Sequence, residues 1–285
     1  MWRRSPVVAG SFYPSNPERL KNDIDRYLKD AGPRSLKSEI LALIVPHAGY
    51  VYSGPVAAYS YAQLAGAAID IAVVLAPSHR ARFNGASIVP SGVFETPLGE
   101  VKIDPVIGEA LEKQPHFKFI KEAHQHEHSL EVQLPFMQRV IPGFALVPVI
   151  IGSVDFETCE AIAHELHAVL APEKRSCVIV ISTDLSHYYS YDQARRLDGA
   201  FVESLKKFDA TAMYRALSMD EVQACGEGPV LVGLMLGSLL KARGVEILKY
   251  ANSGDTAGGR DQGLAVEEGA GWGAASVRDA AAKCL

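Results

Sequence analysis

Short, nearly continuous apolar runs rich in valine and isoleucine recur along the chain. They cover residues 40–46, 69–77, 145–152 and 177–182. Strands of a parallel sheet that is covered on both faces have this composition, because neither face needs polar positions. The four runs therefore predict buried strands that alternate with helical segments.

A helical pattern precedes the first of these runs. Residues 16–32 place Leu20 and Ile24 on one apolar stripe, with Asn16 as the N-cap, a proline at the first helical position and Gly32 at the end. Such caps are the usual signals of helix boundaries. We expect one helix over this range.

The C-terminal part of the chain mixes both patterns. Residues 218–221, Ser-Met-Asp-Glu, form a capping-box sequence and predict a short helix that ends near Cys225. Residues 229–244 predict a second, mostly buried helix. Residues 245–277 predict strands joined by a glycine-rich loop around 254–263, which we expect to be the most mobile part.

The alternation of the predicted strands and helices indicates the fold class. Strands that alternate with helices are typical of α/β proteins, in which helices cover a central sheet. No internal repeat or linker divides the sequence. We therefore predict a single α/β domain over residues 1–285, with a central, largely parallel or mixed sheet flanked by helices.

Composition and charge exclude several classes of function. Apolar residues make up 48% of the 285 residues, and the formal net charge is -5 at pH 7, with no cluster of lysine and arginine. Nucleic acid is not an expected partner, because a groove that binds it needs a basic patch. No segment has the length of a signal-peptide core or a membrane span, so we expect a cytoplasmic protein without membrane contact.

Side chains suited to metal binding follow three of the predicted strands directly. His47, His79 and the pair Asp184 and His187 each come just after an apolar run. In open α/β sheets the ligand site lies beyond the carboxyl ends of the strands, so these side chains can meet there. Two imidazoles and one anionic ligand are the minimum set for an open iron, copper or zinc site.

The anionic ligand has three candidates. Asp184 and Glu131 offer carboxylates, and Cys225 offers a thiolate in a glycine-rich turn between two predicted helices. Loops carry functional residues more often than regular elements do. Cys159 and Cys177 lie in a predicted helix and a predicted strand, where a cysteine is usually a buried apolar residue. The residues alone leave all three candidates open.

Six stretches of the sequence together resemble the Memo family, whose prokaryotic members are called AmmeMemoRadiSam system protein B. In chain order they are VAGSFYPSNP, VPHAGYVYSGPVAA, LAPSH, EHSLEVQLPF, STDLSHY and ACGEGPVLVGL. The resemblance implies a fold similar to that of the class III, LigB-type extradiol ring-cleaving dioxygenases, which are non-haem iron enzymes.

The resemblance implies a metal-binding set made of His47, His79 and Cys225. The ring-cleaving dioxygenases use two histidines and one carboxylate, whereas Cys225 stands at the corresponding third position in this chain. A thiolate is a softer ligand than a carboxylate. Iron or copper is therefore the expected metal, with zinc as the alternative, and ordinary ring cleavage is not the expected reaction.

The same resemblance implies further residues of the pocket. Asp184 and His187 are expected to line it, and Phe12 is expected at its rim. Animal Memo proteins have a tryptophan where this chain has Phe12, so peptide recognition through that indole is not expected to transfer. An imidazole beside a metal can move protons, and His187 is a candidate for that role.

Residues 122–131 hold three of the nine histidines in the chain. The apolar spacing downstream predicts that a helix begins near Ser129, after the histidines. Pro135 is expected to end or kink that helix, because its ring cannot continue the hydrogen-bonding pattern. Most of the histidine-rich segment should therefore be loop.

Two residues of this segment fall within the family motif. His128 and Glu131 are expected to face the pocket as acid/base groups or as groups that orient a ligand. For His124 and His126, a solvated position and a position in the pocket both stay open.

Three hypotheses about function follow, and they differ in kind. The first is a redox enzyme with iron or copper. The second is a vestigial dioxygenase pocket that binds a peptide or an anionic small molecule. The third is a zinc hydrolase with Asp184 or Glu131 as the base. The family name also implies a radical-SAM protein or an AMMECR-domain protein as a possible partner.

Overall fold

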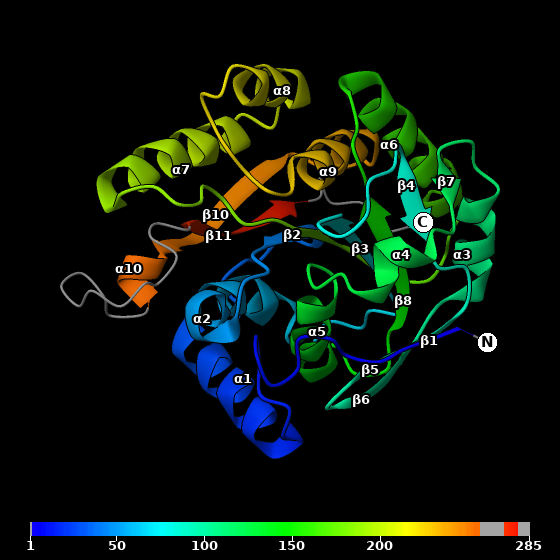
Figure 1. The fold of residues 1–285 in the computed structure, drawn as a ribbon, viewed down its shortest axis with the longest axis horizontal. Helices are drawn as coiled ribbons and strands as arrows, with labels where there is room; N and C mark the ends of the chain where they lie inside the picture. Colours follow the sequence, from blue (N-terminus) through cyan, green and yellow to red (C-terminus); the bar gives the residue numbers. More distant parts are fainter. Residues whose placement is uncertain (1, 257–270, 279–285) are drawn as a thin grey trace.

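The computed structural model describes residues 2–256 and 271–278 (Figure 1). Its strands are β1 Trp2–Arg4, β2 Ile40–Val45, β3 Ile71–Pro77, β4 Ala86–Ile88, β5 Gly92–Thr96, β6 Gly99–Lys102, β7 Phe117–Lys118, β8 Ala145–Ile151, β9 Cys177–Ser182, β10 Gly244–Asn252 and β11 Gly271–Arg278. Its α-helices are α1 Pro17–Ala31, α2 Tyr50–Tyr61, α3 Pro105–Glu112, α4 Lys121–Gln125, α5 Leu134–Val140, α6 Phe156–Leu170, α7 Tyr191–Lys206, α8 Ala210–Ser218, α9 Glu227–Leu239 and α10 Ser253–Thr256. Two 3-10 turns, η1 Ala62–Leu64 and η2 Glu131–Gln133, complete the described elements.

A mixed eight-stranded sheet forms the centre of the fold. Its order is β10-β11-β2-β9-β3-β8-β4-β7, and the four central strands β2, β9, β3 and β8 run parallel. Strand β11 pairs antiparallel with both of its neighbours, and β4 pairs antiparallel with β8. The parallel centre carries the carboxyl ends of β2, β9 and β3 to one edge, which is where α/β sheets place their sites.

Helices cover both faces of this sheet. Figure 1 shows α6, α7, α8 and α9 on one side and α1, α2 and α5 on the other. The buried side chains divide in the same way into two large hydrophobic clusters. The α/β prediction with a largely parallel, mixed sheet is therefore confirmed. A smaller three-stranded sheet, in the order β1-β5-β6, holds the N-terminal strand.

The four predicted strands are confirmed as β2, β3, β8 and β9, within two residues at each end. The predicted N-terminal helix is confirmed as α1. Asn16 Oδ1 accepts a hydrogen bond of 2.9 Å from the backbone N–H of Arg19, and Gly32 has a φ of +81°. These are the cap geometries that the sequence signals anticipate.

The helix predicted from residues 218–221 to Cys225 was wrong. Ser218 is the last residue of α8, and its hydroxyl donates to the carbonyl of Tyr214 at 2.8 Å instead of capping a new helix. Asp220 then has a φ of +54°, which ends any helical continuation. The following helix, predicted over 229–244, is α9. It begins two residues earlier and ends at Leu239, and Lys241, with a φ of +63°, does not continue the right-handed helix.

The region around the histidine-rich segment also differs from the prediction. Residues Lys121–Gln125 form the short helix α4, and the next regular turn begins at Glu131, not near Ser129. Pro135 neither ends nor kinks a helix. It occupies the first turn of α5, where its missing N–H has no intrahelical partner to lose.

The predicted C-terminal strands are confirmed as β10 and β11. Of the glycine-rich loop, Gly254 lies in α10, and residues 257–263 lie outside the described residues. Within the described ranges, every helix is too short or too polar to cross a bilayer.

Candidate metal centre

Three parallel strands deliver the candidate ligands to one edge of the sheet. His47 follows β2, His79 follows β3, and Asp184 follows β9. The described part of the chain contains two groups of potential metal ligands. Within each group the ligand atoms lie within 4.8 Å of one another, and both groups include His47. One group joins His47 to His79 and His128, and the other joins it to Asp184 and Cys225, so the expected set of His47, His79 and Cys225 is divided between the two groups.

Hydrogen bonds set the tautomer of His47. The carbonyl of Pro46 can only accept, so the amide nitrogen of Gln133 faces it at 2.9 Å, and the same nitrogen donates to Ser182 Oγ at 2.8 Å. Ser182 donates its own proton to the carbonyl of Ser129 at 2.7 Å. The contact of 2.9 Å between His47 Nδ1 and Ser182 Oγ must therefore be a donation from the imidazole. A neutral His47 then has its Nε2 lone pair free for the site.

The thiol of Cys225 faces the Nε2 lone pair of His47. Its Sγ lies 3.0 Å from His47 Nε2, and the backbone N–H and carbonyl of Asp184 hold the cysteine in place. Cys225 N donates to the carbonyl of Asp184 at 3.1 Å, and the N–H of Asp184 donates to Cys225 Sγ at 3.2 Å. The next residue is Gly226, where a Cβ would come within 2.6 Å of the carbonyl oxygen of Ser182. A glycine therefore allows the turn to approach the end of β9 this closely.

The protonation of this pair follows from its surroundings. Burial, followed by the charges of neighbouring histidines, lowers the pKa of His47 well below its usual value. Burial, followed by the charge of Asp184, raises the pKa of the Cys225 thiol well above its usual value. Without a cation the pair is thus a thiol that donates to a neutral imidazole. A metal ion would supply the positive charge that stabilises the thiolate.

His79 is oriented by a carboxylate that the sequence analysis missed. Glu127 is buried, and its Oε1 lies 2.9 Å from His79 Nδ1, while its other oxygen accepts from the backbone N–H of His79. Burial raises the pKa of Glu127, but the hydrogen bonds and charge of His79 outweigh that effect and lower it to about 2. With Nδ1 held by a carboxylate, Nε2 of His79 is the atom left to bind a ligand.

His128 and Phe12 lie beside the two imidazoles. The His128 ring stacks on that of His79 with centroids 4.8 Å apart, and the Phe12 ring meets the His128 ring edge-on at 5.0 Å. Burial is the main cause that lowers the pKa of His128 to about 4. A neutral imidazole at this position can accept a proton or a hydrogen bond.

The family model described as "Memo-like protein" matches residues 4–269 of this chain. The match includes every residue of the two ligand groups. The chain belongs to the Memo family. A MEMO1 family protein of Saccharolobus solfataricus is 37% identical over 272 residues, which cover 91% of this chain and 95% of that relative. A MEMO1 family protein of Sulfolobus acidocaldarius is 37% identical over 268 residues, which cover 90% and 94%.

A solved structure is also similar to this Memo-family chain. It is the crystal structure of an uncharacterized protein from Escherichia coli K12, with a TM-score of 0.49 and 14% sequence identity. The similarity covers 84% of this chain and 100% of that chain.

Glu131 lies in a different part of this Memo-family chain from the one expected. Its buried carboxylate pairs with Arg4, accepts from the hydroxyl of Tyr13, and accepts from the backbone N–H groups of Val7 and Val8. Neither ligand group includes it. The structure thus joins Glu131 by hydrogen bonds to the N-terminal segment that carries Phe12, while its charge acts on the pKa of the nearby His128.

His124 and His126, for which the sequence left two positions open, differ in burial. His126 is exposed, as expected of a solvated residue. His124 is 1% exposed, and its Nε2 lies 3.0 Å from Ser87 Oγ. Burial is the main cause that lowers the pKa of His124 to about 3. His124 is therefore neither solvated nor part of a ligand group.

Asp184 and His187 approach the site from the loop after β9. Asp184 Oδ1 accepts the backbone N–H of His47 at 2.7 Å, and its other oxygen lies 3.7 Å from His47 Nε2. His187 is half-buried, and its charge contributes to the lowered pKa of His47. The next residue, Tyr188, is exposed and has a φ of +64°.

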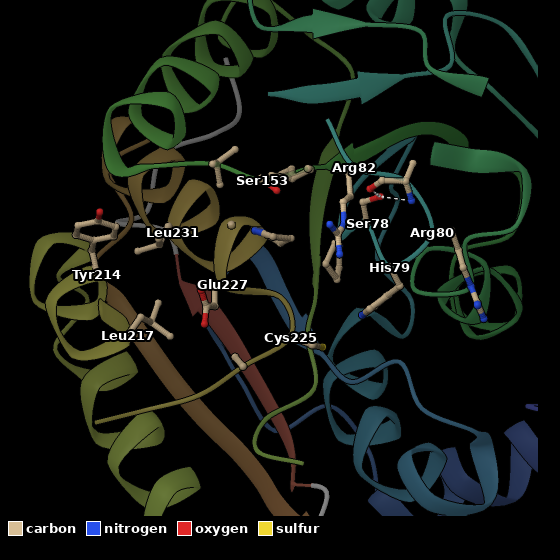
Figure 2. A pocket seen from close by; sticks show the side chains of 18 of the residues that line it. Ser78, His79, Arg80, Arg82, Ser153, Tyr214, Leu217, Cys225, Glu227 and Leu231 are labelled. Atoms are coloured by element: carbon tan, nitrogen blue, oxygen red, sulfur yellow. Dashed lines mark hydrogen bonds between the residues drawn. The ribbon is translucent and has the colours of Figure 1, made fainter. Parts of the chain in front are cut away.

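A cavity of about 650 Å³ lies beside the candidate metal centre, and its lining does not include Phe12, Asp184 or His187. Both His79 and Cys225 line it. Figure 2 shows these two side chains near one end of the cavity, with Tyr214 and Leu217 at the other end. A volume of this size is typical of a small-molecule site.

Proposed function

We propose that this Memo-family protein is a redox enzyme of the oxygenase type, in which His47, His79 and Cys225 bind one iron or copper ion. The observation that carries the proposal is the contact of 3.0 Å between His47 Nε2 and Cys225 Sγ. Two neutral imidazoles and a thiolate form a set that suits both metals.

The donor atoms support this reading. His47 and His79 each have Nδ1 occupied, by Ser182 and by Glu127, so each has Nε2 available. A hydrogen-bond partner that fixes the second ring nitrogen, such as the Glu127 carboxylate, is characteristic of histidines that bind metals. A bound iron or copper ion would supply one-electron redox chemistry at the end of the cavity.

The surrounding residues have separate tasks in the proposed enzyme. Asp184 holds the backbone N–H of His47 and so fixes that imidazole relative to Cys225. His128 is one candidate for proton transfer beside the two imidazoles: its pKa of about 4 keeps it neutral, so it holds an added proton only weakly and can pass it on. His187 is the second candidate for proton transfer, and the Phe12 ring packs edge-on against the ring of His128.

Metal analysis and visible absorption of anaerobically purified protein test this proposal. We expect about one iron or copper ion per chain and a thiolate-to-metal absorption band in the oxidised state. Stoichiometric zinc in a colourless protein would favour the hydrolase hypothesis instead. A protein that binds none of these metals would favour a vestigial pocket for peptides or anions.

A further inference from the structure

The cavity beside the candidate metal centre has two chemically different ends. Near His79, polar lining comes from the loop after β3 and includes Ser78 and Arg82, while Ser153, Ser218 and Glu227 add polar groups elsewhere in the lining. Its apolar lining comes from α8 and α9 and includes Tyr214, Leu217 and Leu231. Figure 2 shows Arg82 on the side of His79, with the apolar group on the far side of Glu227. The polar end is therefore the end next to the candidate ligands.

Arg82 is the charged group best placed to meet a ligand at that end. Its residue is exposed, and within the described part of the chain its guanidinium has no hydrogen bond or ion pair. Arg80 also borders the cavity, but Figure 2 shows its side chain directed away from Cys225. A guanidinium recognises a carboxylate through two parallel hydrogen bonds.

The apolar end offers a surface for the body of the ligand. Leu217 is 7% exposed and Leu231 is 4% exposed, so both are held firmly in the core beneath the cavity. Tyr214 is half-buried and packs against Phe156, with ring centroids 5.1 Å apart. A ring or branched chain bound here would bury its own apolar surface and that of Tyr214, the half-buried member of the group.

We propose that this cavity binds a small amphipathic carboxylate. Its carboxylate pairs with Arg82 beside the candidate metal centre, and its apolar body lies against Tyr214, Leu217 and Leu231. Glu227 borders the cavity between the two ends, so an anionic group is disfavoured there. That such a ligand is the substrate rests on the proposed function, whereas its binding does not require a metal.

Three probes separate the two features of the ligand. They are 3-phenylpropionate, its uncharged amide 3-phenylpropanamide, and acetate, which lacks the apolar body. Binding is measured by calorimetry and ligand-detected NMR on the full chain, both as purified and after removal of metal by a chelator. We expect 3-phenylpropionate to bind about fivefold or more tightly than either other probe in both states.

Arg82 variants then test the polar end. Arg82→Gln should weaken 3-phenylpropionate binding about fivefold and leave the amide unchanged, whereas Arg82→Lys should keep most of the affinity because it keeps the charge. Arg19→Gln is the matched control, since Arg19 is exposed on α1 and does not border the cavity. Leu217→Ala should weaken both aromatic probes equally, provided that its thermal unfolding shows a folded protein.

Several outcomes would overturn the proposal. Equal affinities for 3-phenylpropionate and its amide, no effect of Arg82→Gln, or no binding of any probe at millimolar concentration would each do so. Binding that vanishes with the metal but survives Arg82→Gln would show that the carboxylate is held by the metal ion instead. Metal content is measured on the same samples, so a failure of the metal proposal is seen separately from a failure of the carboxylate site.

Discussion

His47 Nε2 lies 3.0 Å from Cys225 Sγ, although 178 positions separate the two residues in the chain. The hydrogen bonds around Ser182 leave the imidazole nitrogen without a proton, so the thiol is the donor of the pair. A metal ion held by His47 Nε2 and Cys225 Sγ would take the place of that proton, and the contact of His47 Nδ1 with Ser182 involves neither of these atoms. Binding of a metal ion by Cys225 and His47 would therefore release the thiol proton.

Substitution of Cys225 tests the identity of the anionic ligand. Cys225→Ser should lower metal affinity about 100-fold, because a neutral hydroxyl is a poor ligand for the ion. Cys225→Asp should bind ferrous iron better than Cys225→Ser does, because it restores a set of two imidazoles and one carboxylate. Both variants should lose any thiolate-to-metal absorption band. Competition with a chelator measures the affinities.

A second cysteine provides the control for this series. Cys159 is fully buried on α6, so Cys159→Ser should lower the free energy of unfolding while metal affinity stays unchanged. Cys177 is a weaker choice, since it is only half-buried at the start of β9. Equal metal affinity in the wild type and both Cys225 variants would make Asp184 the leading candidate for the third ligand.

Removal of either imidazole ligand should abolish metal binding. His47→Ala and His79→Ala should each reduce metal content to near zero, because two remaining ligands hold an exchangeable ion poorly. His126→Ala is the matched control, since His126 is exposed and nearby in sequence. Metal analysis beside circular dichroism distinguishes lost binding from lost folding. Full occupancy in the His47 and His79 variants would refute the assignment.

Glu127 is expected to act on the metal through His79. Glu127→Gln keeps the size of the side chain but removes the charge that orients Nδ1 of His79. Loss of such a partner typically costs 10- to 100-fold, so we expect metal affinity to fall by about that factor. Titration with a chelator measures it. If affinity is unchanged, the Glu127 carboxylate serves only the local backbone.

His187 is expected to affect turnover without affecting the metal. His187→Ala should keep metal content and thermal stability while it impairs whatever oxygen consumption or ligand conversion the protein shows, because a proton carrier is lost. Oxygen uptake with metal analysis on the same preparation provides both readouts. Loss of the metal in this variant would instead make His187 a ligand.

The buried histidines should make the fold sensitive to acid. The pKa of His124 falls from 6.5 to about 3 on folding, so the unfolded chain takes up a proton that the folded chain refuses. Protonation of His124 therefore does not change the free energy of unfolding above about pH 6.5. As the pH falls below about 6.5, it lowers that free energy by up to about 1.4 kcal/mol per pH unit. His124→Gln should reduce the slope by that amount in urea unfolding between pH 6.5 and 4. An unchanged slope would contradict the role of His124.

The local sequence determined the elements and the edge of the sheet at which the site lies. The apolar runs that became β2, β3 and β9 are complete within a few residues each, so their burial can be read without knowledge of their neighbours. The residues that follow them, His47, His79 and Asp184, meet because parallel strands end at one edge. The capping-box sequence at 218–221 gave a wrong prediction of a helix start, because Ser218 is the last residue of α8.

Only the tertiary structure decided which partner each buried glutamate binds. Glu127 and Glu131 lie four positions apart, yet Glu127 bonds to His79 and Glu131 bonds to Arg4, at separations of 48 and 127 residues. The contact of Cys225 with His47 is likewise set by how α9 and β2 are placed on the sheet. Periodicity and cap signals reach only one or two helical turns, whereas these hydrogen bonds depend on the packing of distant elements. The sequence therefore determined the types of ligand present, and the packing of the sheet and helices decided their partners.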